Sequence, residues 1–229
     1  MSTVGFIPAR GGSKGLPNKN ILDFCGKPLI AWSIEQALNS EYLDNVYVST
    51  DSEEIADIAK YYGAEVPFLR PAEISGDTAT TESAMFHFCD WLKSKQFDVD
   101  NIMLIQATSP IRKPGQFCRA IKQFEDSDSD SLLSVTESHR FFWVNPEVPT
   151  ANYDYLNRPR RQDISSNDRN YLETGSFYIT KINMLIESKS RLCGKISFFQ
   201  TEEEEAYEID SLSDFKICET LYKNYLLGY

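Results

Sequence analysis

The sequence predicts an α/β protein in which a mostly parallel β-sheet is sandwiched by helices. Short apolar runs alternate with stretches whose apolar residues recur at helical spacing, and the first apolar run leads directly into a glycine-rich loop. The chain has 229 residues, of which 41% are hydrophobic, which is enough for the core of one domain. We therefore expect a single domain spanning residues 1–229.

The first half of the chain supplies most of the alternation. Strands are predicted for Thr3–Pro8, Asn45–Ser49, Glu65–Phe68, Asn101–Gln106 and Ser131–Thr136. Helices are predicted for Leu29–Ser40 and Pro114–Glu125. A further helix is predicted to begin at Asp51 as N-cap, with Glu54 completing a capping box, and to end at Gly63. Another is capped by Thr80 or Thr81 and continues through Leu92. This order predicts parallel strands joined by helices.

The pattern changes after Thr136. Residues 137–170 combine aromatic side chains, prolines and arginines without a clear period, which predicts an arm that leaves the main sheet. Gly175–Thr180, Ile196–Gln200 and a last helix over Ser213–Leu227 are expected to return to the core.

Composition excludes several classes of function. The net charge of −11 argues against nucleic-acid binding, and no apolar stretch approaches the ~18 residues of a membrane span. The N-terminus lacks the pattern of a signal peptide, and five scattered cysteines suit a reducing compartment, so we expect a cytoplasmic protein. The two histidines, His87 and His139, are too few for a histidine-rich metal centre.

The loop within Ile7–Ile21, IPARGGSKGLPNKNI, is the strongest local signal. It follows the first predicted strand, where open α/β sheets bind ligands, and combines three glycines with Arg10, Lys14 and Lys19. It matches neither the Walker pattern nor the G-x-G-x-x-G pattern. Glycine backbone and cationic side chains together predict a site for phosphate groups. A second basic island, around Arg158–Arg161, indicates a further anion site.

An ordered set of motifs resembles the CMP-N-acylneuraminate synthetases, a family of sugar nucleotidyltransferases with a Rossmann-like, GT-A-type fold. The resemblance rests on IPARGGSKGLPNKNI with GKPLI, VSTDSEEIADIAKYYGAEVPFLRPAEISGDTATT, LIQATSPIR, RPRRQD, ETGSFYI and YEIDSLSDF. It covers nearly the whole chain. It implies transfer of CMP from CTP to the anomeric hydroxyl of a nine-carbon 2-keto-3-deoxy sugar acid, with release of pyrophosphate. N-acetylneuraminate is the acceptor that the resemblance favours.

Other acceptors fit the same motifs. They are legionaminic, pseudaminic or deaminated sialic acid and, less well, the eight-carbon acid Kdo. Related Kdo synthetases carry an aspartate where this chain has Thr108. A non-catalytic nucleotide-binding module is the alternative from a different class.

The resemblance also implies site residues. For the nucleotide they are Arg10, Gly11, Ser13, Lys14, Lys19, Asn20, Arg70 and Thr81, and for the sugar Gln106, Thr108, Ser109, Arg161 and Gln162. Mg²⁺, or Mn²⁺, is expected to bind Asp210. Glu208 stands beside it and is expected to bind the ion directly, to bind it through water, or not to bind it. Arg10, Lys19 and Asp210 are the expected catalytic residues. Arg112 is expected to brace the loop after Gln106, and Asp77 either to brace its own loop or to contact the ligand.

The segment 137–170 resembles the dimerisation arm of the same family. The resemblance therefore implies a homodimer, anchored by the aromatic cluster Phe141, Phe142 and Trp143 unless that cluster belongs to the monomer core.

Overall fold

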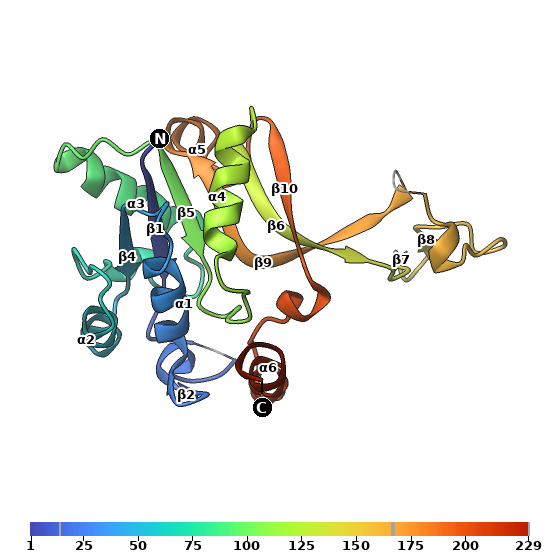
Figure 1. The fold of residues 1–229 in the computed structure, drawn as a ribbon, viewed down its shortest axis with the longest axis horizontal. Coiled ribbons are helices and arrows are strands. Elements are labelled where there is room, and N and C mark those ends of the chain that lie inside the picture. The colour runs from blue at the N-terminus through green and yellow to red at the C-terminus, as the bar shows by residue number, and fades with distance from the viewer. Residues whose placement is uncertain (14, 166–167, 229) are drawn as a thin grey trace.

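A six-stranded sheet forms the centre of the molecule in the computed structural model, which describes residues 1–13, 15–165 and 168–228 (Figure 1). Its strands lie in the order β10-β6-β9-β5-β1-β4. Their bounds are β1 Thr3–Pro8, β4 Asn45–Ser49, β5 Asn101–Ile105, β6 Ser131–Ser138, β9 Asn170–Lys181 and β10 Ile196–Thr201. Two-residue strands form two small separate sheets: β2 Asp23–Phe24 with β3 Lys27–Pro28, and β7 Trp143–Val144 with β8 Thr150–Ala151.

One reversed strand interrupts an otherwise parallel sheet. β1 pairs in parallel with β4 and β5, and β10 pairs in parallel with β6, whereas β9 runs antiparallel to both of its neighbours. The predicted mostly parallel sheet is therefore confirmed. The apolar runs do not reveal the direction of β9, because a strand buried on both faces has the same composition in either direction.

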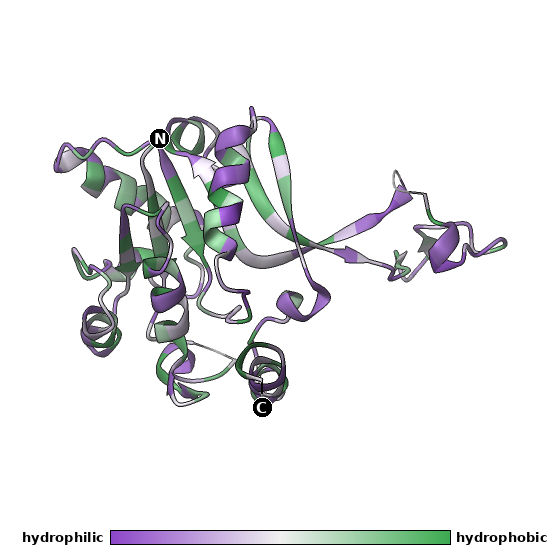
Figure 2. Cartoon of the chain, in the orientation of Figure 1, coloured by the Kyte–Doolittle hydropathy of each residue, from purple (hydrophilic) through white to green (hydrophobic). Residues whose placement is uncertain are grey.

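Helices cover both faces of the sheet (Figures 1 and 2). Apolar residues of α1 Leu29–Leu38, α2 Glu53–Tyr61 and α4 Gln116–Asp126 pack in one core cluster, which includes Ile7 of β1. Residues of α3 Thr81–Ser94 and α5 Ile182–Ser188 pack in a second cluster, which includes the neighbouring Phe6. Successive strand residues point to opposite faces, so Phe6 and Ile7 supply different cores.

The last helix belongs to a third, smaller cluster. α6 Leu212–Tyr222 and the π-helical turn Lys223–Leu227 follow the last strand. Phe215 and Tyr222 of α6 pack edge-on against Phe24, and Ile111 and Ile209 complete the contact. This cluster fixes the segment around Ile209 beside the N-terminal loop. No helix in the described ranges is long and apolar enough to cross a membrane.

Several element boundaries differ from the sequence prediction. Glu65–Phe68 forms no continuous strand, and only isolated bridges join Glu65 to Tyr47 and Leu69 to Thr50. The N-cap of α2 is Ser52, whose side chain accepts a hydrogen bond from the Ile55 amide, so the predicted Asp51–Glu54 capping box is wrong. Asp51 instead binds the N-terminal loop, as described below.

Two other helix starts are also settled by the structure. α4 begins at Gln116 after Gly115, which has φ +69°, so Pro114 precedes the helix. Of the two candidates for the cap of α3, the structure selects Thr80, whose hydroxyl accepts from the Ser83 amide. Gly63 follows α2 with φ +94°, as predicted for a glycine that ends a helix.

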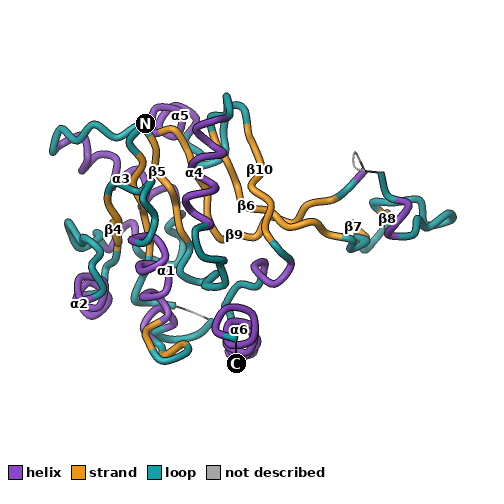
Figure 3. Tube along the Cα trace, viewed as in Figure 1, coloured by secondary structure: helices purple, strands orange, loops and turns teal. Residues whose placement is uncertain are grey.

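The segment between β6 and β9 projects from the sheet (Figure 3). The outer ends of β6 and β9 continue as a pair, from Val135 opposite Glu173 to Ser138 opposite Asn170, and the short β7–β8 pair lies beyond them. The register shifts between Leu133 and Val135, next to Gly175 with φ +66°. A bulge of this kind bends a strand pair, which directs the arm away from the core.

Candidate active site

The N-terminal loop lies at the carboxyl edge of the parallel strands. It begins where β1 ends, and the Ala9 amide still donates to the Ser49 carbonyl of β4. The Gly11 amide then donates to Oδ1 of Asp51 over 2.9 Å. Asp51 lies two residues after the end of β4, so the ends of two adjacent strands hold the start of the loop, which is where open α/β sheets bind ligands.

Lys19 connects this loop to the segment before α6. Its side chain is buried, and Nζ donates to the Ile209 carbonyl over 2.5 Å and to Oδ1 of Asp210 over 3.0 Å. A Cβ atom on Gly15 would lie 2.2 Å from the Asp210 carbonyl oxygen, so the loop and this segment approach so closely that only glycine fits. Two predicted catalytic residues, 191 positions apart, are therefore in direct contact.

A cavity of about 200 Å³ opens beside Arg10. Arg10 Nη1 binds the Gly76 carbonyl over 3.1 Å and Oδ1 of Asp77 over 3.2 Å. Arg70 and Thr81 line the same cavity, and Arg70 Nε binds Oγ of Ser75. Burial lowers the pKa of the Arg70 guanidinium, and the nearby Arg10 adds to this effect while Asp51 opposes it. Two guanidinium groups at one cavity favour an anionic ligand.

An adjoining cavity of about 190 Å³ is lined by the loop itself. Arg10, Ser13, Lys19 and Asn20 contribute to it, and Asn20 Nδ2 holds the Arg10 carbonyl over 3.2 Å. Arg10 and Gln106 line both cavities, so the two form one site. Gly11 lies at its start, bound to Asp51, while Lys14 lies outside the described residues.

Glu208 and Thr108 connect this site to a third cavity. The Thr108 hydroxyl lines the loop cavity and donates to Oε1 of Glu208 over 3.0 Å. Loss of hydration raises the pKa of the Glu208 carboxyl, and the Asp210 carboxylate adds to the rise, whereas Thr108 and Lys19 counter it. Glu208 and Asp210 thus act on one another electrostatically at the same edge of the sheet.

The third cavity, of about 360 Å³, lies between the sheet and the arm. Arg161 and Glu208 both line it, together with His139 and Arg140, which directly follow β6. Gln162 is exposed on the short helical turn η3 Arg161–Asp163 and does not line this cavity. Of the predicted sugar-binding residues, Gln106, Thr108 and Arg161 therefore line the connected cavities.

Ser109 is not brought to the site. Its side chain is fully buried, and it lines none of the three cavities. It follows Thr108 on the short turn after β5, and that turn directs it into the protein.

The donor set near Asp210 suits a metal ion that takes few ligands from the protein. Among the described residues no three His, Cys, Asp or Glu side chains cluster closely enough to hold a metal. Asp210 and Glu208 supply two carboxylates, and Asp210 has an exposed side chain with one oxygen outside its contact to Lys19. Mg²⁺ commonly binds one or two carboxylates and completes its shell with water and substrate phosphates. The residues therefore fit a cation that arrives with a phosphorylated ligand.

Arg112 braces the loop after Gln106, as expected. It is buried, and its guanidinium makes five hydrogen bonds, to Ser33, Gln36 and the Gln106 carbonyl and to the hydroxyl and carbonyl of Ser176. Burial lowers its pKa to about 9, so the group stays charged at neutral pH. By holding the Gln106 carbonyl over 2.5 Å, Arg112 fixes the residue shared by two cavities.

Replacing Arg112 with methionine should destabilise the fold by about 3 kcal/mol or more, because several buried acceptors lose their donor together. The free energy of unfolding in urea measures this loss. The matched change Arg119→Met removes an exposed arginine of α4 and should stay within about 0.5 kcal/mol of the unmodified protein. Equal losses in the two variants would contradict the bracing role.

Sequence reasoning missed three residues at this edge. Asp51 was assigned to a helix cap, although it binds the loop amide of Gly11. His139 and Arg140 line the third cavity, but they stand in the aperiodic segment, where no pattern distinguishes a ligand-facing side chain. The signal available for Asp51 was its place close to the end of a strand, similar to that of Gln106, which directly follows β5.

A basic glycine loop at the carboxyl edge of a parallel sheet, with connected cavities and two carboxylates, is the arrangement of a nucleotide-binding α/β protein. A family model described as cytidylyltransferase matches residues 4–229. The chain therefore belongs to the cytidylyltransferase family, as the sequence motifs indicated.

Relatives named as cytidylyltransferases are similar over most of the chain. Pseudaminic acid cytidylyltransferase of Campylobacter jejuni subsp. jejuni serotype O:23/36 is 34% identical over 228 residues, which cover 97% of each chain. N-acylneuraminate cytidylyltransferase A of Danio rerio is 38% identical over 220 residues, covering 93% of this chain and 49% of that protein.

The fold is also found among solved structures. A CMP:2-keto-3-deoxy-manno-octonic acid synthetase complexed with CTP superimposes with a TM-score of 0.72 at 17% identity, covering 99% of this chain and all of that chain. This likeness confirms the GT-A-type fold that the motifs predicted.

Proposed function

We propose that the protein transfers CMP from CTP to the anomeric hydroxyl of a nine-carbon 2-keto-3-deoxy sugar acid and releases pyrophosphate. The observation that carries the proposal is the pair of cavities that meet at Arg10 and Gln106, with Lys19 and Asp210 in contact beside them. Both relatives described above carry names of cytidylyltransferases for acids of this class. The non-catalytic alternative gives no reason for a buried lysine aimed at an exposed carboxylate.

In this reaction the anomeric oxygen attacks the α-phosphorus, the bond to pyrophosphate breaks, and the proton of the hydroxyl group is released to water. Negative charge grows on the leaving group, and a fixed cation near it stabilises the transition state. Arg10 and Lys19 occupy that role, with Ser13, Asn20 and the loop amides around the phosphates. Arg70 and Thr81 line the adjoining cavity, which we assign to the cytidine.

The acceptor lies on the side of Gln106, Thr108 and Arg161 in this proposal. An arginine fork recognises a carboxylate well, and Arg161 lines the third cavity together with Arg140. Glu208 lines the same cavity, and its carboxylate can accept hydrogen bonds from the hydroxyl groups of a sugar. The proposed substrates are CTP and a sugar acid, so the proposal includes no nucleic-acid partner.

N-acetylneuraminate and pseudaminic acid are the two acceptors to compare. The first has support from the 38% identity to the Danio rerio protein, and the second from a relative matched over 97% of both chains. Pyrophosphate release with CTP, Mg²⁺ and each acid, together with legionaminic acid and Kdo, measures the preference as kcat/KM. Absence of release with every acid would overturn the proposed reaction, and release with Kdo alone would redirect it.

We propose that Mg²⁺, or Mn²⁺, binds at Asp210, with Glu208 as the second carboxylate. When bound, the ion neutralises charge on the phosphates. Asp210→Asn preserves an acceptor for Lys19 but removes the charge. Mutation of a residue that only supports a metal ligand already lowers metal affinity by about 10–100-fold. Loss of a direct ligand should therefore raise the half-saturating Mg²⁺ concentration by at least about tenfold.

Titration of activity with Mg²⁺ measures this change. Asp57→Asn on α2 is the matched control, because Asp57 is exposed on a different element, and its titration should be unchanged. A normal Mg²⁺ titration in Asp210→Asn would remove Asp210 from the metal site.

The arm supports a further proposal, a homodimer. Phe142 and Trp143 are 46% and 52% exposed, and Phe141 packs on Tyr153 of the arm itself with ring centroids 4.2 Å apart. The aromatic cluster therefore lies outside the three core clusters of the described chain. Exposed apolar side chains gathered on a projecting hairpin are typical of an interaction surface. A cytoplasmic location also remains a proposal, supported by five free cysteines.

The variant Phe142→Asp/Trp143→Asp should convert the dimer to a monomer, because two carboxylates then have to be buried without partners. Light scattering after size exclusion gives the mass. Tyr61→Asp changes an aromatic residue on α2 that is 84% exposed and lies outside the arm, and it should leave the mass at that of the dimer. A dimeric mass for the double variant would contradict the role of the arm.

A further inference from the structure

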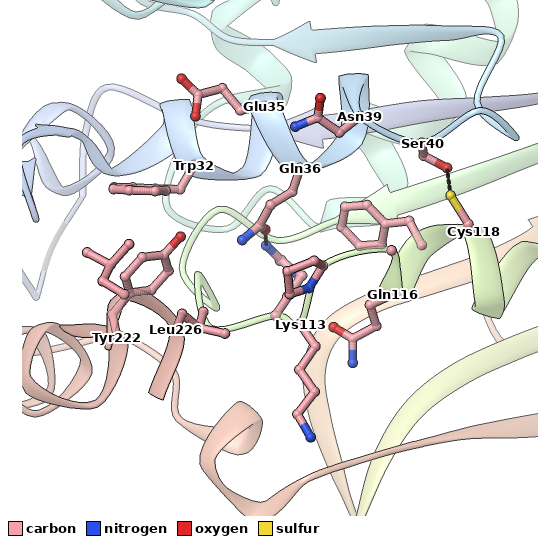
Figure 4. Close-up of a pocket in the computed structure, with 15 residues that line it drawn as sticks. Trp32, Glu35, Gln36, Asn39, Ser40, Lys113, Gln116, Cys118, Tyr222 and Leu226 are labelled. Atoms are coloured by element: carbon pink, nitrogen blue, oxygen red, sulfur yellow. Dashed lines mark hydrogen bonds between the residues drawn. The ribbon is translucent and has the colours of Figure 1, made fainter. Parts of the chain in front are cut away.

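A further cavity, of about 280 Å³, lies beside α1 and α6, away from the proposed active site (Figure 4). The charges of Lys113 and Glu35 at its walls are balanced locally, because Lys113 pairs with Glu202 over 3.1 Å and Glu35 with Lys27 over 2.5 Å. A more informative ion pair lies on the face of the sheet that α3 and α5 cover, where it joins two walls of the active site.

Arg191 is the cation of this ion pair. It belongs to the loop between α5 and β10 and lines none of the four cavities. Its Nη1 atom donates to Oε1 of Glu82 over 2.8 Å. The two side chains are only 25% and 22% exposed, so solvent and salt screen this pair less than a pair on open surface. The contact therefore restricts where the two chain segments can lie.

The carboxylate partner belongs to a wall of the nucleotide cavity. Glu82 lies in the first turn of α3, directly after Thr81, and both Thr80 and Thr81 line the cavity assigned to cytidine. The Thr80 hydroxyl accepts from the Ser83 amide, which fixes the shape of this turn. Arg191 reaches the same turn from 109 residues away in the sequence, so it fixes the place of the turn relative to the sheet.

The second contact of Arg191 leads to the acceptor side. Its Cζ atom lies 4.7 Å from the centroid of the Tyr178 ring, over that ring. Tyr178 is 3% exposed on β9, and its hydroxyl donates to the Glu173 carboxylate. Burial raises the pKa of this phenol and Glu173 adds to the rise, while Arg191 opposes it, so the hydroxyl keeps its proton at neutral pH. Glu173 directly follows Leu172, which lines the third cavity at the base of the arm.

The shape of the Arg191 side chain matters as well as its charge. Its Nε atom is buried and has no hydrogen-bond partner in the described part of the chain. An unpaired buried donor is unfavourable, and a lysine would not carry it. The planar guanidinium offsets this cost, because one group can pair with Glu82 and lie flat on the Tyr178 ring at the same time.

We propose that Arg191 is a positioning residue that holds the start of α3 on the nucleotide side and the base of the arm on the acceptor side. Because it lines neither cavity, it acts through Glu82 and through the pair of Tyr178 and Glu173. The identity of the two ligands rests on the proposed function, whereas the geometry of the two walls does not. Loss of the guanidinium should weaken ground-state binding on both sides more than it slows the chemical step.

Hydrogen exchange of the unliganded protein tests the geometry without any assumption about the reaction. In Arg191→Met, the amides of residues 83–86 and 171–174 should exchange at least about fivefold faster, because local opening of both segments becomes easier. Lys195→Met is the matched control in the same loop, since Lys195 forms an exposed pair with Asp128 over 3.6 Å, and it should leave both segments unchanged. Unchanged exchange of either segment in Arg191→Met would overturn the proposal.

Steady-state kinetics test the consequence for the two substrates. With CTP and whichever of N-acetylneuraminate and pseudaminic acid gives the higher kcat/KM, Arg191→Met should raise both KM values by about fivefold or more and keep kcat within about twofold. Arg191→Lys can still pair with Glu82 but lacks the planar group over Tyr178, so it should recover KM for CTP more than KM for the acid. A lower kcat with both KM values unchanged would indicate loss of folded protein only and would overturn the positioning role.

Two further variants separate the two contacts. Glu82→Gln should raise KM for CTP alone, and Tyr178→Phe, which keeps the ring but loses the bond to Glu173, should raise KM for the acid alone. The reverse pattern would overturn the proposal. If the unmodified protein releases no pyrophosphate with either acid, the proposed function fails, and the exchange experiment still decides the role of Arg191. Normal KM values in Arg191→Met would overturn that role and leave the proposed reaction in place.

Discussion

Gly15→Ala should lower kcat by about 100-fold or more while most of the stability of the fold is retained. A Cβ at this position would lie 2.2 Å from the Asp210 carbonyl oxygen, and neither backbone segment can accommodate that contact without moving. The shift separates the loop that carries Lys19 from the segment that carries Asp210. A displacement of about 1 Å in a catalytic arrangement costs on the order of 100-fold in rate.

Gly12→Ala is the matched control in the same loop. A Cβ on Gly12 meets no atom within 4 Å, so this variant should keep kcat within about twofold. This change is much smaller than the loss of about 100-fold expected when catalytic groups are displaced. Steady-state pyrophosphate release and the free energy of unfolding, measured for both variants, separate a local displacement from general destabilisation. Similar rates for Gly15→Ala and Gly12→Ala would contradict the close approach.

The sheet was predictable where its strands are short, mostly buried and apolar. Thr3–Pro8 and Asn45–Ser49 were predicted to the residue. Glu65–Phe68 was not, because its composition allows an extended conformation, whereas pairing with Tyr47 depends on where the chain turns after α2. Local composition therefore specifies strands with a continuous buried run, the edge strand β4 included, better than a segment joined to the sheet only by isolated bridges.

The site was predictable to the extent that it follows strand ends. Lys19 and Gln106 stand after β1 and β5, and the structure brings both to the same cavity. The contact of Lys19 with Asp210 depends on packing of α6 against Phe24, a tertiary event that no local pattern encodes. Ser109 illustrates the reverse, since its neighbour Thr108 reaches the site and Ser109 points into the core.

Lys19→Met should lower kcat by about 100- to 1,000-fold, the loss typical of removing one preorganised donor from a charge-stabilising site. Lys19 has a 10% exposed side chain held by the Ile209 carbonyl and by Asp210, so its ammonium group is fixed before substrate arrives. A group fixed in this way stabilises charge without reorganisation during the reaction. KM for CTP should change less than kcat, because the interaction grows as pyrophosphate departs.

Two comparisons distinguish this role from a structural one. Lys27→Met removes a lysine that pairs with Glu35 and covers the Trp32 ring, outside the proposed active site, and it should leave kcat within about threefold, the effect of a surface ion pair. Lys19→Arg keeps the positive charge on a side chain of different shape, so its kcat should exceed that of Lys19→Met. If Lys19 had only a structural role, the two variants should lose the same factor in kcat. A loss confined to KM in Lys19→Met would assign Lys19 to ground-state binding of CTP instead of to the transition state.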